Sequence, residues 1–282
     1  MVADLLKNVV YNSHTNFMSK LICIESYIDK DRNHYGNFLI EPLELGQGIT
    51  LGNALRRTLL SDLTGFAITG ARINNLKHEF AVVEGLREDI LEVLLNLKEI
   101  VFKSSYFSAS QKKETKLKAF INIQGPIVIT AGMLQLPKNS LKVINPNQYI
   151  CTIVDNSYFY LEVDIENGKG YQLTDENRKK IINEKFNISK PSTLVLDSIF
   201  FPIKKANYKI KLIHDTRGNI KESLNFEILT NGSITPKRGV QESLKILINL
   251  FYPLFVNPTF LVASSELAKK FYINSNEKNL KI

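Results

Sequence analysis

The chain has 282 residues, of which 44% are hydrophobic and 23% are charged. This composition fits one or two folded domains and excludes a disordered chain. No apolar run reaches the roughly 18 residues of a membrane-spanning helix, and the opening residues lack the apolar block of a secretory signal peptide. The net charge of +8 is compatible with nucleic-acid binding, but also with simple solubility.

The two cysteines, Cys23 and Cys151, lie far apart in the sequence. Their separation offers no metal-binding spacing and no disulfide framework, so a reducing compartment is expected. The thiol of Cys151 lies in a β-rich run, where a structural role is the simplest interpretation.

The first predicted elements are two extended segments within residues 20–45, separated by the polar turn DKDRNHYG. A helix is expected from about Thr50, whose hydroxyl is a candidate N-cap. Gly52, near the start of this helix, would let another backbone approach closely. Strands are then predicted at residues 65–76 and 78–83.

The helix after Thr50 has two different faces at 100° per residue. Asn53, Arg57 and Ser61 share a polar side, and Arg56 lies at its border. The broad apolar side carries Leu51, Ala54, Leu55, Thr58, Leu59 and Leu63. One face therefore suits burial and the other suits an arginine-mediated contact.

The glycines before this helix raise the alternative of a phosphate-binding loop. The stretch GQGITLGN lacks the Gly-Lys-Ser/Thr ending of a P-loop. Gly46, Gly48 and Gly52 are spaced one residue too widely for the dinucleotide-binding fingerprint. A small phosphate-using enzyme is thus the weakest interpretation.

The middle of the chain predicts one amphipathic helix within residues 85–102, followed by short strands over residues 117–165 and a polar loop over residues 171–192. The apolar side of that helix would hold Leu86, Ile90, Val93, Leu94 and Leu97. Residues 193–232 again read as strands. Because strands and helices mix without strict βαβ alternation, the predicted class is α+β, with a helix-plus-sheet domain interrupted by a β-rich one.

The last predicted element is a long helix after Ser233 or Thr235, either of which could cap it, with Pro236 in the first turn. Pro253 should end or bend this helix near Tyr252. Its apolar stripe consists of Val240, Leu244, Leu247, Ile248, Phe251, Leu254 and Phe255. The pattern alone does not separate an internal core helix from a subunit interface.

No motif concentrates catalytic chemistry. His14, His34, His78 and His214 show no metal-ligand spacing, and no nucleophile elbow is present. We expect no catalytic residue, no metal site and no cofactor on this chain.

Two long stretches carry a resemblance: EPLELGQGITLGNALRRTLLSDLTGFAITGARI and HEFAVVEGLREDILEVLLNLKEI. They closely resemble the alpha subunit of bacterial-type DNA-directed RNA polymerase, including plastid forms, and shorter matches extend the resemblance over most of residues 20–256. The resemblance implies a non-catalytic subunit of a nucleotidyltransferase. It would form a homodimer and nucleate binding of the beta and beta-prime type large subunits.

The same resemblance implies a domain organisation. A discontinuous dimerisation and assembly domain would comprise residues 1–64 and 191–260. An inserted β-rich domain would comprise residues 65–190, and residues 261–282 would form a polar tail.

Residue roles also follow from the resemblance. Arg57, with Arg56 beside it, matches the arginine that engages the beta subunit, and Lys98 and Gly170 of the GKGY turn match regions that contact the large subunits. The two amphipathic helices would pack on their mates across a two-fold axis. The implied dimer interface is Leu51, Leu55, Leu59, Val240, Leu244, Leu247, Ile248 and Phe251.

Two departures from the family pattern matter, and the first is Pro253 within the aromatic run LFYPLF, which is unusual in a dimer helix. The second is that the usual C-terminal DNA-binding domain is not expected in the 26 residues after the last helix. This chain would therefore contact DNA only indirectly, through the assembled enzyme. Together with the Lys, Asn and Ile bias, this favours the plastid stroma, with the bacterial cytoplasm as the alternative and no membrane association. A stand-alone basic nucleic-acid-binding protein remains the alternative function.

Overall fold

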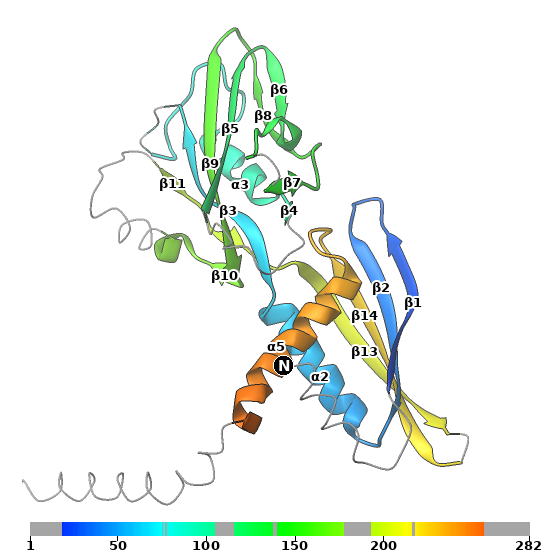
Figure 1. The fold of residues 1–282 in the computed structure, drawn as a ribbon. Coiled ribbons are helices and arrows are strands. Elements are labelled where there is room, and N and C mark those ends of the chain that lie inside the picture. The colour runs from blue at the N-terminus through cyan, green and yellow to red at the C-terminus, as the bar shows by residue number, and fades with distance from the viewer. Residues whose placement is uncertain are drawn as a thin grey trace, which may run out of the picture.

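The computed structural model describes residues 19–74, 76, 78–104, 116–137, 140–177, 193–215 and 218–256. They form an α+β fold with two lobes (Figure 1), which confirms the predicted class. Strand β3 (Thr64–Ile73) follows helix α2 (Gln47–Ser61) almost directly and carries the chain from one lobe to the other. In this part of the chain, no helix is long and apolar enough to cross a membrane.

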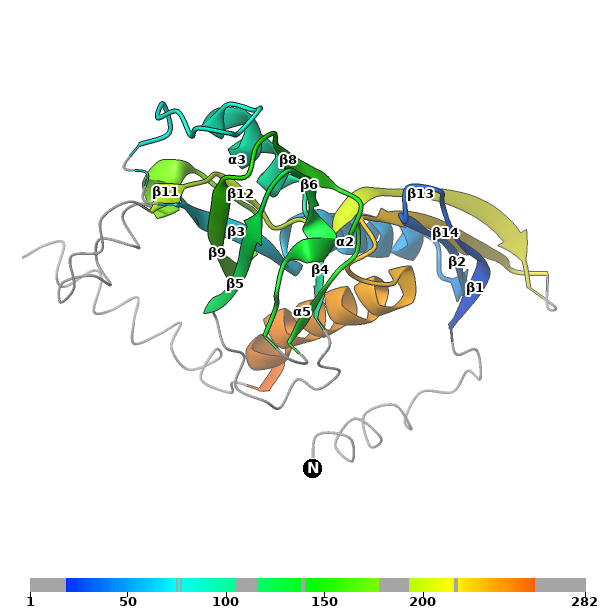
Figure 2. The ribbon, with the colours of Figure 1, turned by 90° about the horizontal axis from the view of Figure 1, so that it is seen from above.

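The first lobe is a four-stranded antiparallel sheet with two helices on one face (Figure 2). The strand order is β1 (Lys20–Ile28), β2 (His34–Leu43), β14 (Ile220–Thr230) and β13 (Ile203–His214). Helix α2 contacts β13 and β14, and helix α5 (Pro236–Val256) contacts β2, β14 and α2. Between these layers lies a core that includes Phe38, Leu55, Leu59, Leu224, Phe226 and Val240.

The second lobe has a separate core. Its main sheet has the order β11 (Leu194–Val195), β3, β9 (Tyr158–Lys169) and β5 (Lys116–Gln124). Helix α3 (Ile90–Lys98) buries Ile90, Val93, Leu94 and Leu97 against this lobe. Three two-stranded pairs complete it: β4 (Phe102–Ser104) with β7 (Leu141–Val143), β6 (Ile127–Thr130) with β8 (Tyr149–Ile153), and β10 (Tyr171–Gln172) with β12 (Ser198–Ile199).

The N-terminus of α2 differs from the predicted one. The helix begins at Gln47, and the hydroxyl of Thr50 donates to the Gly46 carbonyl (3.1 Å) instead of capping the helix. The carboxylate of Glu222, on β14, accepts hydrogen bonds from the backbone N–H groups of Gly46 (3.0 Å) and Gly48 (2.8 Å). The predicted Thr50 cap is therefore wrong, because a carboxylate distant in sequence satisfies the orphan donors.

Gly52 does permit a close approach, but the approaching group is an aromatic ring and not a backbone. A Cβ atom at Gly52 would lie 2.7 Å from a ring carbon of Tyr208 on β13. The Tyr208 hydroxyl also donates to Asn53 (2.8 Å). Helix α2 thus lies close to the sheet at a point where only glycine leaves room for the ring.

The predicted strand at residues 78–83 is wrong. Of this segment, Phe80 and Val82 are largely exposed, and no strand forms there. The predicted helix is also shorter at its start, because α3 begins at Ile90 and Leu86 instead forms a bridge with Ile153. The buried carboxylate of Glu88 accepts the Thr152 N–H (2.7 Å) and so holds this approach to the helix on β8.

Helix α5 continues through Pro253 to Val256, so of the two predicted alternatives, an end or a bend near Tyr252, the end is excluded. At its start, Thr235 Oγ1 accepts the Arg238 N–H (3.4 Å), and Pro236 occupies the first turn as predicted. The predicted loop at residues 171–192 begins with strand β10 and a helical turn at residues 174–177. Its remainder, residues 178–192, and the predicted polar tail lie outside the described residues.

The crossing between the lobes generates a stability prediction. A Cβ atom at Gly65 would lie 2.2 Å from the backbone carbonyl oxygen of Phe200. Gly65→Ala should therefore lower the free energy of unfolding by about 1–3 kcal/mol, because a backbone atom must move. Urea denaturation followed by circular dichroism measures the change. Thr64→Ala, at the exposed neighbouring position, is the control, and equal stabilities of the two variants would contradict the prediction.

Candidate functional site

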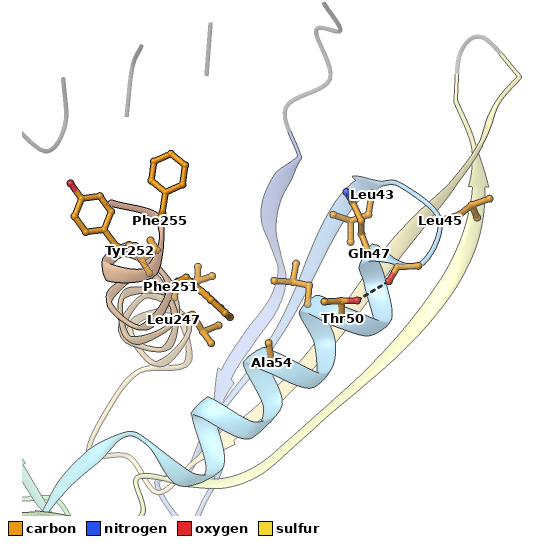
Figure 3. Close-up of a pocket in the computed structure, with 13 residues that line it drawn as sticks. Leu43, Leu45, Gln47, Thr50, Ala54, Leu247, Phe251, Tyr252 and Phe255 are labelled. Carbon is orange, nitrogen blue, oxygen red and sulfur yellow. Dashed lines mark hydrogen bonds between the residues drawn. The ribbon is translucent and has the colours of Figure 1, made fainter. Parts of the chain in front are cut away.

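An open apolar groove separates α2 from the C-terminal half of α5 (Figure 3). Its volume is about 810 Å³. The side chains that line it include Leu43, Leu45, Leu51, Leu247, Phe251 and Phe255. An exposed surface of this kind is typical of a contact with another protein.

The structure divides the residues of the predicted dimer interface into two groups. Leu55, Leu59 and Val240 are at most 1% exposed in the core of the first lobe, so they cannot contact a second copy directly. Leu51, Leu244 and Leu247 are half-buried, whereas Ile248 is 55% exposed and Phe251 is 59% exposed. The residues at the groove are therefore the only predicted interface residues that remain available to a partner.

Leu45 belongs to the same surface but was missed by the sequence analysis. It lies in the loop before α2, where helical periodicity gives no signal, and it is exposed at the groove. Leu254 and Phe255, at the end of α5, are exposed as well. Exposed apolar side chains therefore lie in the loop before α2 and at the end of α5, as well as in the groove between the two helices.

The two adjacent arginines on α2 have different environments. The Arg56 Nε donates to the Ala206 carbonyl (3.1 Å), so this side chain helps to hold α2 on β13. Arg57 is exposed, and none of the described residues forms a hydrogen bond or an ion pair with its guanidinium. Arg57 is thus the arginine that is free to bind a partner.

The carboxylate of Asp197 links Lys98 to Thr174, which lies four residues after Gly170. The Lys98 Nζ lies 3.2 Å from Asp197 Oδ2. Asp197 Oδ1 accepts both the backbone N–H (2.8 Å) and the hydroxyl (2.6 Å) of Thr174. Gly170 has a φ of 76°, and its carbonyl accepts the N–H of Phe200, which follows β12.

The electrostatics of this cluster centre on Asp197. Hydrogen bonds from Thr174 and the ion pair with Lys98 lower the pKa of Asp197 to about 2, against the opposing effect of desolvation. Desolvation and the neighbouring Asp197 carboxylate raise the pKa of Tyr171. At neutral pH the cluster presents a paired ammonium group beside an exposed turn.

Ionisable groups elsewhere in the described chain are dispersed. No three His, Cys, Asp or Glu side chains of the described residues are arranged to hold a metal ion. Cys151 is fully buried, and burial raises the pKa of its thiol to about 12. Burial and the nearby Lys103 ammonium lower the pKa of His34.

Comparisons with known proteins agree with this picture. A family model described as the RNA polymerase Rpb3/RpoA insert domain matches residues 71–201. The chain is 45% identical to the DNA-directed RNA polymerase subunit alpha of Pyropia yezoensis, over 82% of this chain and 70% of that protein. The subunits of Rhodomonas salina (46%) and Trichormus variabilis (41%) match over 82% of this chain and 69% of their own length.

The pKa of Asp197 generates a pH-dependent prediction. The pKa of Asp197 in the folded protein, about 2, lies below the ordinary 3.8. The interactions of the ionised carboxylate with Thr174 and Lys98 therefore stabilise the folded state above pH 4, and this stabilisation is lost as the pH falls toward 2. Asp197→Asn should therefore destabilise the protein by about 1 kcal/mol at pH 7, after allowance for solvent screening. The difference from wild type should shrink between pH 4 and pH 2.

Urea denaturation at pH 7, 5, 4 and 3 measures that difference. Asp175→Asn, at an exposed position in the same segment, is the control and should follow the wild type at each pH. A difference between Asp197→Asn and wild type that stays constant over the whole range would contradict the assignment.

Proposed function

We propose that this chain, which belongs to the family of DNA-directed RNA polymerase alpha subunits, is a homodimeric assembly subunit that binds the two large subunits of the enzyme. As a member of that family it is part of a nucleotidyltransferase complex that transcribes DNA. The observation that carries the assembly role is the exposed apolar groove between α2 and α5.

The homodimer is supported by the apolar character of the groove. Full burial of a side chain such as Ile248 or Phe251 contributes roughly 1.5–3 kcal/mol of gross transfer free energy. Homodimer interfaces are more apolar than the rest of a protein surface, and two-fold symmetry lets one groove serve both copies. In the proposed interface, Leu51, Leu244, Leu247, Ile248 and Phe251 make direct contacts, and Leu55, Leu59 and Val240 support them from the core.

We assign residues 1–64 and 191–260 to the dimerisation and assembly domain, residues 65–190 to the inserted domain and residues 261–282 to a tail. The two separate hydrophobic cores support this division. The insert-domain match at residues 71–201 overlaps the proposed insert closely.

The proposed large-subunit contacts are Arg57, Lys98 and Gly170, with Arg56 acting through the position of α2. An exposed guanidinium such as that of Arg57 can hold a planar acceptor with two hydrogen bonds. The Lys98 side chain is 26% exposed, and a Cβ atom added at Gly170 would meet open space. A partner could therefore approach both.

Catalysis and DNA contact are assigned to other chains of the enzyme, and no cofactor is assigned to this one. Relatives from red algae and cryptophytes support the plastid stroma as the location, with the bacterial cytoplasm as the alternative that the cyanobacterial relatives keep open.

The dimer proposal predicts the effect of a buried charge. Phe251→Glu should weaken dimerisation by about 100-fold or more, because an unpaired carboxylate would be desolvated in the groove. Size-exclusion chromatography with light scattering at micromolar concentration measures the oligomeric state. Phe80→Glu, at an exposed position in the other lobe, is the control and should remain dimeric. A wild-type protein that is folded and monomeric under these conditions would refute the dimer.

The role of Arg57 predicts a separate defect. Arg57→Ala should remain dimeric but recover at least about 10-fold less beta-type subunit in a co-purification, because a central arginine anchor contributes more than 1.4 kcal/mol. Arg57→Lys should restore only part of the recovery, since an ammonium lacks the planar fork. Lys20→Ala is the matched control. Wild-type recovery by Arg57→Ala would argue against the contact.

A further inference from the structure

Strand β13 carries a concentration of positive charge that the proposed function does not use. Four of its residues, Lys204, Lys205, Lys209 and Lys211, are exposed, and we name them the lysine edge. Since β13 is the last strand in the order of its sheet, the lysine edge lies at a free sheet edge (Figure 2). Among the described residues, no carboxylate forms an ion pair with any of these lysines.

In the four-stranded sheet of the second lobe, basic side chains form ion pairs with carboxylates of a neighbouring strand. On β5, the Lys118 Nζ lies 2.7 Å from Glu162 Oε1 of β9. On β3, the Arg72 guanidinium lies 2.9 Å from Asp164 Oδ2 of β9. The cations of that sheet are thus paired with carboxylates, whereas no carboxylate of the described residues forms an ion pair with the lysine edge, which can therefore bind an external anion.

Lysines on an edge strand can also serve to prevent edge-to-edge aggregation. On that interpretation they should protect the more apolar edge of the same sheet, which is β1. Strand β1 exposes Leu21, Ile22, Ile24, Tyr27 and Ile28, yet its only basic residue is Lys20. The distribution of lysines therefore does not follow the aggregation risk of the two edges.

The register of β13 sets the geometry of the lysine edge. Lys205, Lys209 and Lys211 pair with Leu229, Asn225 and Ser223 of β14, so they share the sheet face opposite the buried Ala206. At about 3.3 Å per residue, Lys205 and Lys211 are about 20 Å apart, the length of an extended segment of about six residues. The nearest carboxylate in the ladder, that of Glu227, lies opposite Asn207 and cannot neutralise three ammonium groups.

We propose that the lysine edge is the docking site for an acidic, extended segment of another polypeptide of the polymerase, an inference that rests on the proposed function. Charge complementarity selects the acidic segment, and the free strand edge offers backbone groups for pairing. Because Arg56 already bonds the Ala206 carbonyl, backbone pairing of the segment is confined to residues 207–214, while its acidic side chains contact Lys205, Lys209 and Lys211. Repulsion between like charges excludes the β13 edge of a second copy.

A protein partner fits this edge better than a nucleic acid does. Single-stranded nucleic acids bind where aromatic rings stack on bases beside a basic groove. The one aromatic residue of β13, Tyr208, packs its ring against Gly52 and bonds Asn53 through its hydroxyl. Strand β13 itself therefore provides no stacking platform beside the lysine edge.

Zero-length carbodiimide cross-linking of the native polymerase tests the partner directly, because it joins an amine only to a carboxylate in contact with it. We expect isopeptide bonds from Lys205, Lys209 or Lys211 to Asp or Glu of a different chain, mapped by mass spectrometry. Amine acetylation should protect these lysines in the assembled enzyme and leave them reactive in the isolated chain. Lysines that stay equally reactive in both, or that DNA alone protects, would overturn the proposal.

Matched variants test the role of charge. The triple variant Lys205→Glu, Lys209→Glu, Lys211→Glu should associate with the large subunits at least about 10-fold more slowly at low salt, and the difference should shrink at high salt. The triple Lys→Arg variant keeps the charge and should behave as wild type. Equal rates for the Glu and wild-type proteins, or an equal defect in the Arg variant, would contradict the docking site.

Recovery of the large subunits and amine acetylation, measured on the same wild-type chain, separate the docking proposal from the proposed assembly function. If the wild-type chain recovers the large subunits while its lysine edge stays reactive, only the docking proposal fails. If the wild-type chain recovers no large subunit at all, the assembly function fails, and the docking proposal fails with it.

Discussion

The structure depends on how closely helix α2 lies on its sheet. The Glu222 carboxylate binds the first backbone N–H groups of the helix, and the Tyr208 ring fills the space that Gly52 leaves open. These two contacts fix the distance between the helix and the sheet, and the rotation of the helix about its own axis. As a consequence, Leu55 faces the core while Arg57 points to solvent. The free arginine and the apolar groove are thus two results of one packing arrangement.

The position of α2 also affects the second lobe, because β3 follows the helix after only two residues. Asp62, at the end of α2, forms an ion pair with Lys169 of β9 (2.5 Å). On the other side of the junction, Arg32 donates to the Ile144 carbonyl. The lobes are therefore joined by contacts as well as by the chain, which gives the surface around Lys98 a defined relation to Arg57.

The surfaces of the protein differ in chemistry. The groove is apolar and suits an interface that excludes water, whereas the lysine edge is charged and suits an electrostatically guided contact. In the second lobe, by contrast, Arg72 and Lys118 form ion pairs with carboxylates of β9. The two surfaces lie on different elements, so the proposed partners would not compete for the same residues.

The sequence by itself determined the α+β class, most of the strands and the existence of the long helices, but not their exact ends or the absence of a strand at residues 78–83, because apolar periodicity reflects burial on one face of an element. It also placed Arg57 on the polar side of its helix. Only the tertiary structure decided the capping of α2 by Glu222, the exposure of Phe80, and the pairing of Lys98 with Asp197. It also decided that Leu55 is core and Ile248 is surface. The physical reason is that periodicity identifies an apolar face but not what covers it, and contacts between residues far apart in the chain leave no local pattern.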